Sequence, residues 1–375
     1  MSLPRALFVA RTRYGLPLSD TLERRFDALS EVLDWHQIGT SRDGASVRTA
    51  RFTLLPRFPV GPLEGAAFYA ALPWRVARSI RAFAPEIVIV QGAQDTTLAL
   101  IGRRLAGSGV PVVFDVHGDW RNDTRMYGSP FRKLISPVTD RLARIAVTRA
   151  DGIRTVSAFT SSIVREQGVE PTATFPAYMD LAPFLERPPA PFPSPPEALF
   201  VGVLERYKAV DVLAQAWPLV AARVPAARLH LVGRGAMWGV VEELVASGGD
   251  RVRWTPELPT AGVAQALDAS TALVLPSRRE GMGRVIVEAF CRGRAVVGTA
   301  SGGIPDLVEQ DVNGLLVPVG DAEALAGALE WVLSDPAAAR RLGAGAWAAA
   351  PGWAATPEQF AARMRDLVDR VLGRA

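Results

Sequence analysis

Two glutamates, Glu280 and Glu288, frame a glycine-rich turn in the stretch VLPSRREGMGRVIVEAFCRGRAVVGTASGG. A carboxylate accepts two hydrogen bonds side by side, which suits the neighbouring hydroxyls of a ribose or a hexose. Gly281 and Gly283 allow a backbone to come close to a ligand, and a helix that starts at Arg284 offers free N–H groups and a positive dipole end. These residues predict a site for a sugar beside a diphosphate.

A plainer interpretation of the same residues stays open. Arg284, Glu288 and Arg292 lie four apart, so they also fit one solvated helix stripe with i,i+4 ion pairs. Glu280 and its two glycines also fit an ordinary turn. Residue types and spacing alone do not separate these interpretations.

The segment E-G-M-G-R-V-I-V-E-A, preceded by P-S and followed by GG-x-P-D, resembles the E-x7-E signature of glycosyltransferase family 4. The resemblance implies that Glu280 contacts the donor sugar and that Glu288 holds the nucleotide ribose. Met282 stands where the family usually has Phe. The residues between the glutamates are expected to line the donor site: Gly281, Met282, Gly283, Arg284 and Val285.

Lys208 resembles the family's phosphate-binding lysine, although a surface lysine is the plainer alternative. The arginine that the family places after a glycine is absent, because Val203 follows Gly202. Arg206 is the candidate substitute, three positions along the chain. A further donor-site loop, expected to approach the nucleotide, contains Gly233 and Gly235 after a strand at 228–232.

In the first half of the chain, His117 directly follows the apolar run VVFDV. A histidine at a strand end suits a site, whereas a structural loop histidine is the alternative. The resemblance places it near the donor sugar and the reaction centre. Gly15 lies in a polar loop at 12–19 after the first strand and is a further candidate. Ser157 is predicted to cap a helix, and His36 and His230 are interpreted as structural.

Alternating apolar runs and amphipathic patterns predict a doubly wound α/β fold, repeated once. The strands are expected at 6–11, 52–55, 87–90, 110–116, 198–204, 228–232, 252–254, 272–275 and 295–299. The helices are expected at 20–33, 65–84, 94–107, 208–224, 284–292, 321–333 and 357–372.

The chain of 375 residues is long enough for two domains. We expect an N-terminal, acceptor-side Rossmann-like domain at 1–187, a proline-rich linker at 188–196 and a nucleotide-sugar-binding Rossmann-like domain at 197–350. A last helix at 351–375 is expected to pack back on the first domain. The resemblance implies the GT-B architecture, in which two such domains face each other across a cleft.

The composition limits the partners and the compartment. The net charge of +4 and the pI of about 9.6 come without a Lys/Arg block, so nucleic acid is not an expected partner. The single Cys291 excludes an intrachain disulfide and predicts a reducing cytoplasm. Neither a signal peptide nor a membrane-spanning stretch is recognised, so we expect a cytoplasmic protein with at most peripheral attachment to the inner face of the membrane.

Residues 48–81 carry that membrane hypothesis, because Arg48, Arg51, Arg57, Arg75, Arg78 and Arg81 interleave with aromatic and aliphatic residues. This pattern suits anionic lipid headgroups. An Arg-rich outer face on a packed helix is the alternative.

The resemblance implies retaining transfer of a hexose from a nucleotide-diphosphate sugar, UDP- or GDP-linked, to a glycan, lipid-linked or small-molecule acceptor, as in polysaccharide biosynthesis. His117, Glu280 and Lys208 are the expected catalytic residues. No cofactor or metal is expected, because we expect positively charged side chains and a helix N-terminus to stabilise the leaving diphosphate instead. A sugar-nucleotide epimerase and a non-catalytic sugar-nucleotide or glycan-binding protein remain alternatives.

Overall fold

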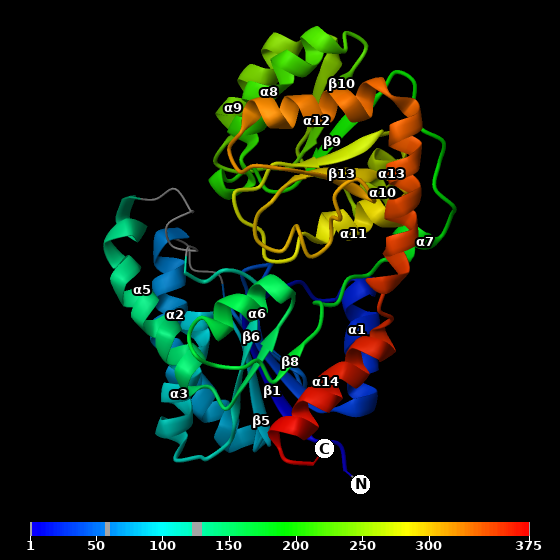
Figure 1. The fold of residues 1–375 in the computed structure, drawn as a ribbon. Helices are drawn as coiled ribbons and strands as arrows, with labels where there is room; N and C mark the ends of the chain where they lie inside the picture. Colours follow the sequence, from blue (N-terminus) through cyan, green and yellow to red (C-terminus); the bar gives the residue numbers. More distant parts are fainter. Residues whose placement is uncertain (1, 57–60, 122–129, 375) are drawn as a thin grey trace. The chain divides into compact units, whose positions relative to one another are not determined.

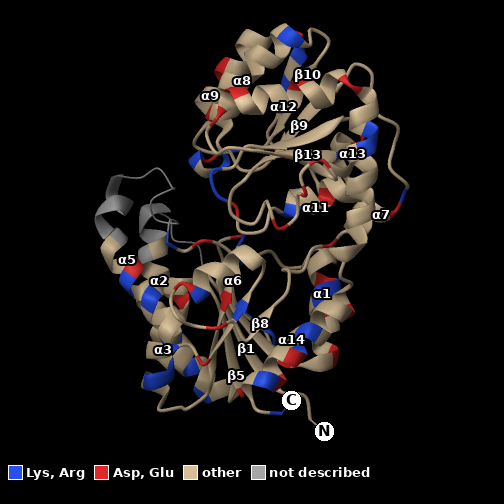
Figure 2. Cartoon of the chain, in the orientation of Figure 1, with Lys and Arg blue, Asp and Glu red and all other residues tan. Residues whose placement is uncertain are grey.

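A computed structural model describes residues 2–56, 61–121 and 130–374 (Figure 1). The chain forms two compact units. The first contains Met1–Arg121, Ile135–Tyr178 and the C-terminal segment Ala355–Ala375, and the second contains Met179–Ala354. Basic and acidic residues occur on both units, in keeping with the small net charge (Figure 2).

The first unit is built on a sheet of eight strands in the order β3-β4-β2-β1-β5-β6-β7-β8. All neighbours are parallel except β3 and β4. The strands are β1 (Arg5–Tyr14), β2 (Asp34–Ser41), β3 (Val47–Arg48), β4 (Phe52–Leu55), β5 (Ile87–Gln91), β6 (Val112–Val116), β7 (Gly152–Thr155) and β8 (Ala173–Thr174).

Helices cover both faces of this sheet. On one face α1 packs beside α14, and on the other α2 packs beside α3 (Figure 1). The last helix of the chain buries Phe360, Met364 and Leu367 in the first unit. The helices of the unit are α1 (Asp20–Val32), α2 (Gly61–Phe83), α3 (Ala93–Ala106), α5 (Pro130–Arg149), α6 (Ala158–Arg165) and α14 (Pro357–Val371).

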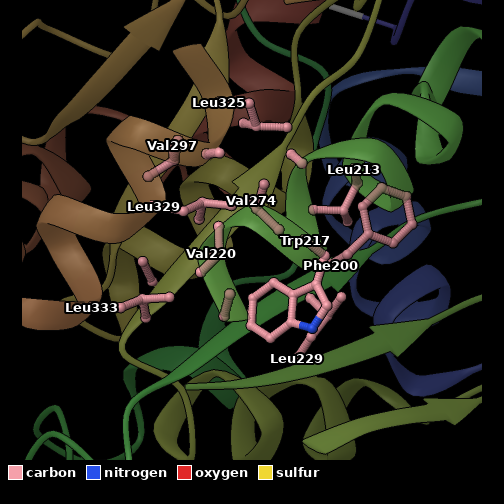
Figure 3. Packing of buried hydrophobic residues seen from close by; sticks show 14 of the residues in the cluster. Phe200, Leu213, Trp217, Val220, Leu229, Val274, Val297, Leu325, Leu329 and Leu333 are labelled. Atoms are coloured by element: carbon pink, nitrogen blue, oxygen red, sulfur yellow. The ribbon is translucent and has the colours of Figure 1, made fainter. Parts of the chain in front are cut away.

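The second unit holds a fully parallel sheet of six strands in the order β11-β10-β9-β12-β13-β14. Its strands are β9 (Glu197–Val201), β10 (Arg228–Val232), β11 (Val252–Thr255), β12 (Ala272–Leu275), β13 (Ala295–Thr299) and β14 (Gly314–Val317). Its core packs Phe200, Trp217 and Val274 against Leu213 and Leu329 (Figure 3). The apolar runs form buried parallel strands, as predicted.

The helices of this unit surround that sheet. Asp321 caps α12, because its carboxylate accepts a hydrogen bond from the Ala324 N–H at 2.9 Å. The helices are α7 (Ala182–Leu185), α8 (Val210–Arg223), α9 (Trp238–Gly248), α10 (Thr260–Asp268), α11 (Arg284–Cys291), α12 (Ala322–Ser334) and α13 (Pro336–Ala349).

The proline-rich segment predicted as a linker is fixed to the second unit. Arg292 donates to the carbonyl oxygens of Phe184 and Arg187 at 3.1 and 2.7 Å, and Arg294 donates to that of Ala190 at 2.8 Å. Asp268 accepts two further bonds from Arg292 at 2.8 Å. Both arginines are buried, so the segment from residue 184 to 191 packs on the second unit.

Two stretches that hold candidate site residues differ from the sequence-based expectation. The predicted loop at 12–19 begins later, because β1 continues to Tyr14 after an irregularity that lets Arg13 pair with Thr40. The predicted helix at 208–224 begins at Val210, since Ala209 adopts a left-handed conformation with φ of 53°. Lys208 therefore ends a separate 3-10 turn that starts at Arg206.

Candidate active site

The loop after β12 brings together two residues that lie 72 positions apart in the chain. The Lys208 ammonium donates to the Glu280 carboxylate, and the Ser277 hydroxyl lies 3.5 Å from the same carboxylate oxygen. The side chains of Lys208 and Glu280 are 11% and 15% exposed, so the ion pair is largely shielded from water. The two residues predicted as catalytic in this unit therefore form one charged centre.

Arg278 fixes the two loops that carry this pair. Its guanidinium donates to both carboxylate oxygens of Asp211, at 2.8 and 2.7 Å, and also to the Arg206 carbonyl at 2.8 Å. Its own N–H donates to the Tyr207 carbonyl at 2.7 Å. Hydrogen bonds from Arg278 hold the pKa of Asp211 below its usual value, so the anchor stays charged. Sequence reasoning missed this anchor, which only the folded chain assembles.

Glycines at 302 and 303 let the chain pack directly on the Glu280 loop. The Gly303 N–H donates to the Glu280 carbonyl at 2.8 Å. A Cβ at Gly302 would lie 2.1 Å from that carbonyl oxygen, which no side chain tolerates. The Gly-Gly pair is therefore required by the backbone that positions Glu280.

The predicted nucleotide loop after β10 shows the same kind of packing. A Cβ at Gly233 would lie 1.8 Å from the Gly202 carbonyl oxygen, and φ at Gly233 is 147°. A Cβ at Gly235 would lie 2.4 Å from the Leu204 carbonyl oxygen. Both glycines therefore bring one loop against another, and the approach of this loop to a nucleotide stays a prediction.

Glu288, on α11, is half-buried and has no hydrogen bond or ion pair with any residue that the structure describes. Burial raises the pKa of its carboxyl, an effect that Arg284 partly offsets. Arg284 is exposed, while Arg292 is buried on Asp268 and the proline-rich segment. A solvated stripe of ion pairs is thus wrong for this helix, and the Glu288 carboxylate keeps its acceptor capacity for a ligand.

The remaining donor-site candidates differ in exposure. Arg206 is exposed and ion-pairs with no described residue. Met282 and Val285 are buried, so most of their surface packs against the protein. Gly15 lies between β1 and α1, where a Cβ would meet only the Arg42 side chain, at 3.6 Å or more. Gly15 belongs to the first unit and the Lys208–Glu280 pair to the second.

In the first unit, His117 ends a chain of polar side chains at the edge of the sheet. Its Nε2 lies 3.0 Å from one Asp115 carboxylate oxygen, and Arg154 donates to the other at 2.7 Å. Burial opposes the ionisation of Asp115, but the charge of Arg154 and the hydrogen bonds from Arg154 and His117 outweigh it and hold its pKa well below the usual range. Asp115 is therefore ionised and holds the imidazole in place.

Sequence reasoning missed both partners of His117. Asp115 and His117 are two residues apart at the end of a strand, and side chains two apart along a strand lie on the same face of the sheet. The sequence alone could therefore have identified Asp115 as a partner of His117. It could not have identified Arg154, which reaches Asp115 because β6 pairs with β7. Its guanidinium is also fixed by the carbonyl oxygens of Phe175 and Pro176, at 3.0 and 2.8 Å.

Three other polar residues have structural roles, in line with the sequence analysis. Ser157 caps α6 by accepting from the Thr160 N–H at 3.1 Å. His36 is bonded to Ala50 and Thr53, and His230 to Thr255 at 2.9 Å. Within the described part of the chain, no three His, Cys, Asp or Glu residues are grouped as metal ligands would be.

The apolar half of the predicted membrane segment lies mostly inside the protein. Phe52, Leu54, Phe68 and Leu72 are buried in the first unit, whereas Trp74 is 67% exposed. Arg57 and Phe58 lie outside the described residues. None of the helices described is long and apolar enough to cross a bilayer. The outer-face interpretation therefore fits most of this segment.

Two family models match the chain, one in each half. "Glycosyl transferase 4-like domain" matches residues 11–177, and "Glycosyl transferases group 1" matches residues 195–335. These matches cover the β-sheet cores of both units and include His117 in the first and Lys208, Glu280 and Glu288 in the second.

Among curated proteins, the D-inositol 3-phosphate glycosyltransferase of Frankia alni is 37% identical over 171 residues, which cover 42% of this chain and 42% of that protein. That of Thermobifida fusca is 33% identical over 182 residues, covering 45% of this chain and 42% of the relative. The chain thus aligns with less than half of the length of these relatives.

Solved structures show the same fold over nearly the whole chain. Sucrose-phosphate synthase from Thermosynechococcus elongatus has a TM-score of 0.79 at 21% identity, and covers 99% of this chain and 100% of its own. HepE from Anabaena, solved in complex with UDP-glucose, has a TM-score of 0.69 at 19% identity, with 96% and 99% covered. At this identity the likeness establishes the fold, which is the predicted one with two Rossmann-like α/β domains.

Proposed function

The chain belongs to glycosyltransferase family 4, and we propose that it transfers a hexose from a nucleotide-diphosphate sugar to an acceptor hydroxyl with retention of anomeric configuration. The observation that carries this proposal is the ion pair between Lys208 and Glu280. A lysine suited to a phosphate and a glutamate suited to a sugar meet although 72 residues separate them.

In the proposed reaction, Lys208 stabilises the negative charge that develops on the leaving diphosphate. Glu280 accepts hydrogen bonds from the hexose hydroxyls and orients the sugar, and Glu288 does the same for the ribose. The bond between the anomeric carbon and the phosphate oxygen breaks while the bond to the acceptor oxygen forms. The acceptor proton passes to the leaving phosphate, so neither a protein base nor a metal ion is required, and a chelator should leave the rate unchanged.

His117 is proposed to hold a sugar hydroxyl during transfer. The ionised Asp115 carboxylate accepts the Nε2 proton of the imidazole, at 3.0 Å, and this leaves Nδ1 as the ring nitrogen that can bond a ligand. That nitrogen then accepts a hydrogen bond from a hydroxyl. Asp115 and Arg154 are positioning residues for it.

The donor is proposed to be a UDP- or GDP-sugar. HepE, which shares the fold, was solved with UDP-glucose, and this supports testing UDP first. The acceptor is proposed to be a glycan, a lipid-linked glycan or a small molecule. The names of the relatives, an inositol 3-phosphate glycosyltransferase and a sucrose-phosphate synthase, favour a small molecule.

One experiment separates this function from its alternatives. A thermal-shift panel of UDP-, GDP-, ADP- and TDP-sugars identifies the donor, because a ligand that binds only the folded state raises the unfolding temperature. The enzyme is then incubated with that donor alone, and slow release of the nucleoside diphosphate and free sugar is expected. An epimerised sugar nucleotide, or donor binding with no release under any acceptor, would contradict the proposal.

A cytoplasmic location with peripheral membrane contact is a separate proposal. Trp74, Arg78 and Arg81 are exposed on α2, and aromatic and basic side chains suit a lipid interface with anionic headgroups. Co-sedimentation with vesicles should need anionic lipid and weaken with salt. Binding that ignores both would contradict it.

A further inference from the structure

A small cavity opens into the first unit between the sheet and two helices. It has a volume of about 80 Å³ and lies at the ends of β1, β5 and β6, under α1 and α14. Parallel strands end at one edge of their sheet, and ligands of α/β folds bind at that edge. The side chains that carry the argument are Thr12, Tyr14, Arg25, Gln91, Asp115 and Phe360.

Arg25, from α1, is the unexplained residue of this cavity. Its Nε is buried without a hydrogen-bond partner, and its guanidinium forms no ion pair with any residue in the described part of the chain. The group instead lies 5.5 and 5.3 Å from the ring centroids of Phe26 and Phe360. A buried donor without an acceptor is unfavourable, so the position calls for an acceptor that a ligand supplies.

The charges around the cavity favour an anion as that acceptor. Asp115 lines the cavity, but Arg154 at 2.7 Å and His117 at 3.0 Å already take both of its oxygens. Tyr14 stays a neutral donor, since burial raises the pKa of its phenol, an effect that Arg25 partly offsets. Arg25 therefore remains the uncompensated charge of the cavity.

The cavity is large enough for a small anion. One water needs roughly 10–15 Å³ of such space, so a cavity of about 80 Å³ takes on the order of five or more small groups. A phosphate group has five heavy atoms. A guanidinium fork also matches a phosphate with two parallel hydrogen bonds.

We propose that this cavity binds a phosphate group of the acceptor, with Arg25 as its principal contact and Gln91 as a second donor. This inference rests on the proposed function, which it narrows to a phosphorylated small molecule as acceptor. His117 follows β6 at the same edge of the sheet, so a phosphate held at Arg25 brings the rest of that molecule towards the side chain proposed for transfer.

The test is calorimetric titration of the full chain with inorganic phosphate, in the presence of saturating UDP or GDP so that the donor site in the second unit is filled. Arg25→Met keeps the aliphatic stem over the rings and removes the charge. It should weaken phosphate binding at least tenfold, the scale of a charge-assisted hydrogen bond, while UDP and GDP bind as in the wild type. Arg24→Met, which changes the neighbouring exposed arginine of α1, is the matched control and should bind phosphate normally.

Competing ligands and a second variant of Arg25 complete the test. Glycerol 3-phosphate should compete with inorganic phosphate, whereas glycerol and acetate should not, which separates a phosphate site from a sugar or carboxylate site. If Arg25→Met does not fold, Arg25→Lys is used, and the loss of the guanidinium fork should still weaken phosphate binding several-fold. Phosphate binding that is unchanged in the folded variant, or acetate binding as tight as phosphate, overturns the inference. UDP and GDP binding, measured in the same variants, reports separately on the proposed function.

Discussion

The sheet edges of the two units hold their polar residues in different ways. In the second unit, close backbone packing contributes to the positioning beside the Arg278–Asp211 ion pair, because Gly233 and Gly302 bring loops within reach of the Gly202 and Glu280 carbonyls. In the first unit, side chains do it, because Asp115 is held by Arg154 from the neighbouring strand. The difference indicates that the sheet edge of the second unit tolerates little change in shape, whereas that of the first unit depends on charge balance.

Gly233→Ala should have the largest effect, because it attacks the backbone packing of the second unit. The new Cβ would lie 1.8 Å from the Gly202 carbonyl oxygen at a φ of 147°, so loops must separate. We expect a loss of at least about 3 kcal/mol in the free energy of unfolding, measured by denaturant titration. Gly239→Ala is the control, since nothing lies within 4 Å of its Cβ and helical alanine is favoured by about 1 kcal/mol. Equal losses of stability in Gly233→Ala and Gly239→Ala would contradict the role of backbone packing in the second unit.

Arg154→Met tests whether charge balance holds the polar residues of the first unit. It leaves the Asp115 carboxylate buried without its main counter-ion, which should cost about 3–5 kcal/mol in unfolding free energy. Arg165→Met, which removes an exposed ion pair with Glu170, should cost about 1 kcal/mol or less. If the two variants are equally stable, the Asp115–Arg154 pair does not hold the first unit.

Lys208→Ala should affect catalysis more than folding. Loss of one stabilising charge at the leaving group should lower kcat roughly 10²- to 10³-fold. Glu280 then loses its partner, but the space left by the truncated lysine side chain lets water reach the carboxylate. Steady-state kinetics with the identified donor measure the effect, and Lys133→Ala, which removes the other lysine of the chain, is the control. Wild-type turnover in Lys208→Ala would show that Lys208 has a structural role rather than a catalytic one.

The stability of the two units should depend differently on pH, and this effect should be smaller than those of the substitutions above. Burial lowers the pKa of His230 to about 4, a shift that Arg253 reinforces, whereas the unfolded chain has an ordinary histidine. Between about pH 6.5 and 4 the unfolded state therefore binds the extra proton, and the second unit should lose about 1–3 kcal/mol as the pH falls. His230→Gln should flatten this loss in denaturant titrations at several pH values.

The Asp115 contribution in the first unit should persist through that range. Its pKa lies below the unfolded value, so its stabilisation is complete above that value and is lost only as the pH falls further. An acid-induced loss of stability between pH 6.5 and 4 that is the same in His230→Gln and the wild type would contradict this assignment.

Local apolar patterns were sufficient to predict much of the fold. The strands at 228–232, 272–275 and 295–299 agree with the structure, because each is a short apolar run between polar turns. β2 was missed since its sequence, DWHQIGTS, is mostly polar, yet Gln37, Thr40 and Ser41 are buried between β4 and β1. Burial by neighbouring strands decides that element, and local sequence does not record it.

The candidate site divides in the same way. Lys208, Glu280 and Glu288 belong to a local motif or a short loop, so the resemblance of these segments to those of the family identified them as candidates. Arg25 and Arg154 were missed, because their importance arises from missing or distant partners. The phosphate cavity depends on helix packing that no pattern of nearby residues encodes.

Glu288 provides the most direct test of the central claim that the second unit binds a nucleotide sugar. Calorimetry compares binding of UDP and GDP to the wild type and to Glu288→Gln, with the exposed Glu309→Gln as control. Loss of a charged acceptor for the ribose hydroxyls should weaken the preferred diphosphate at least tenfold, since such a bond contributes about 1.5–3 kcal/mol. Wild-type affinity in Glu288→Gln would contradict the claim and leave Glu288 without a ligand.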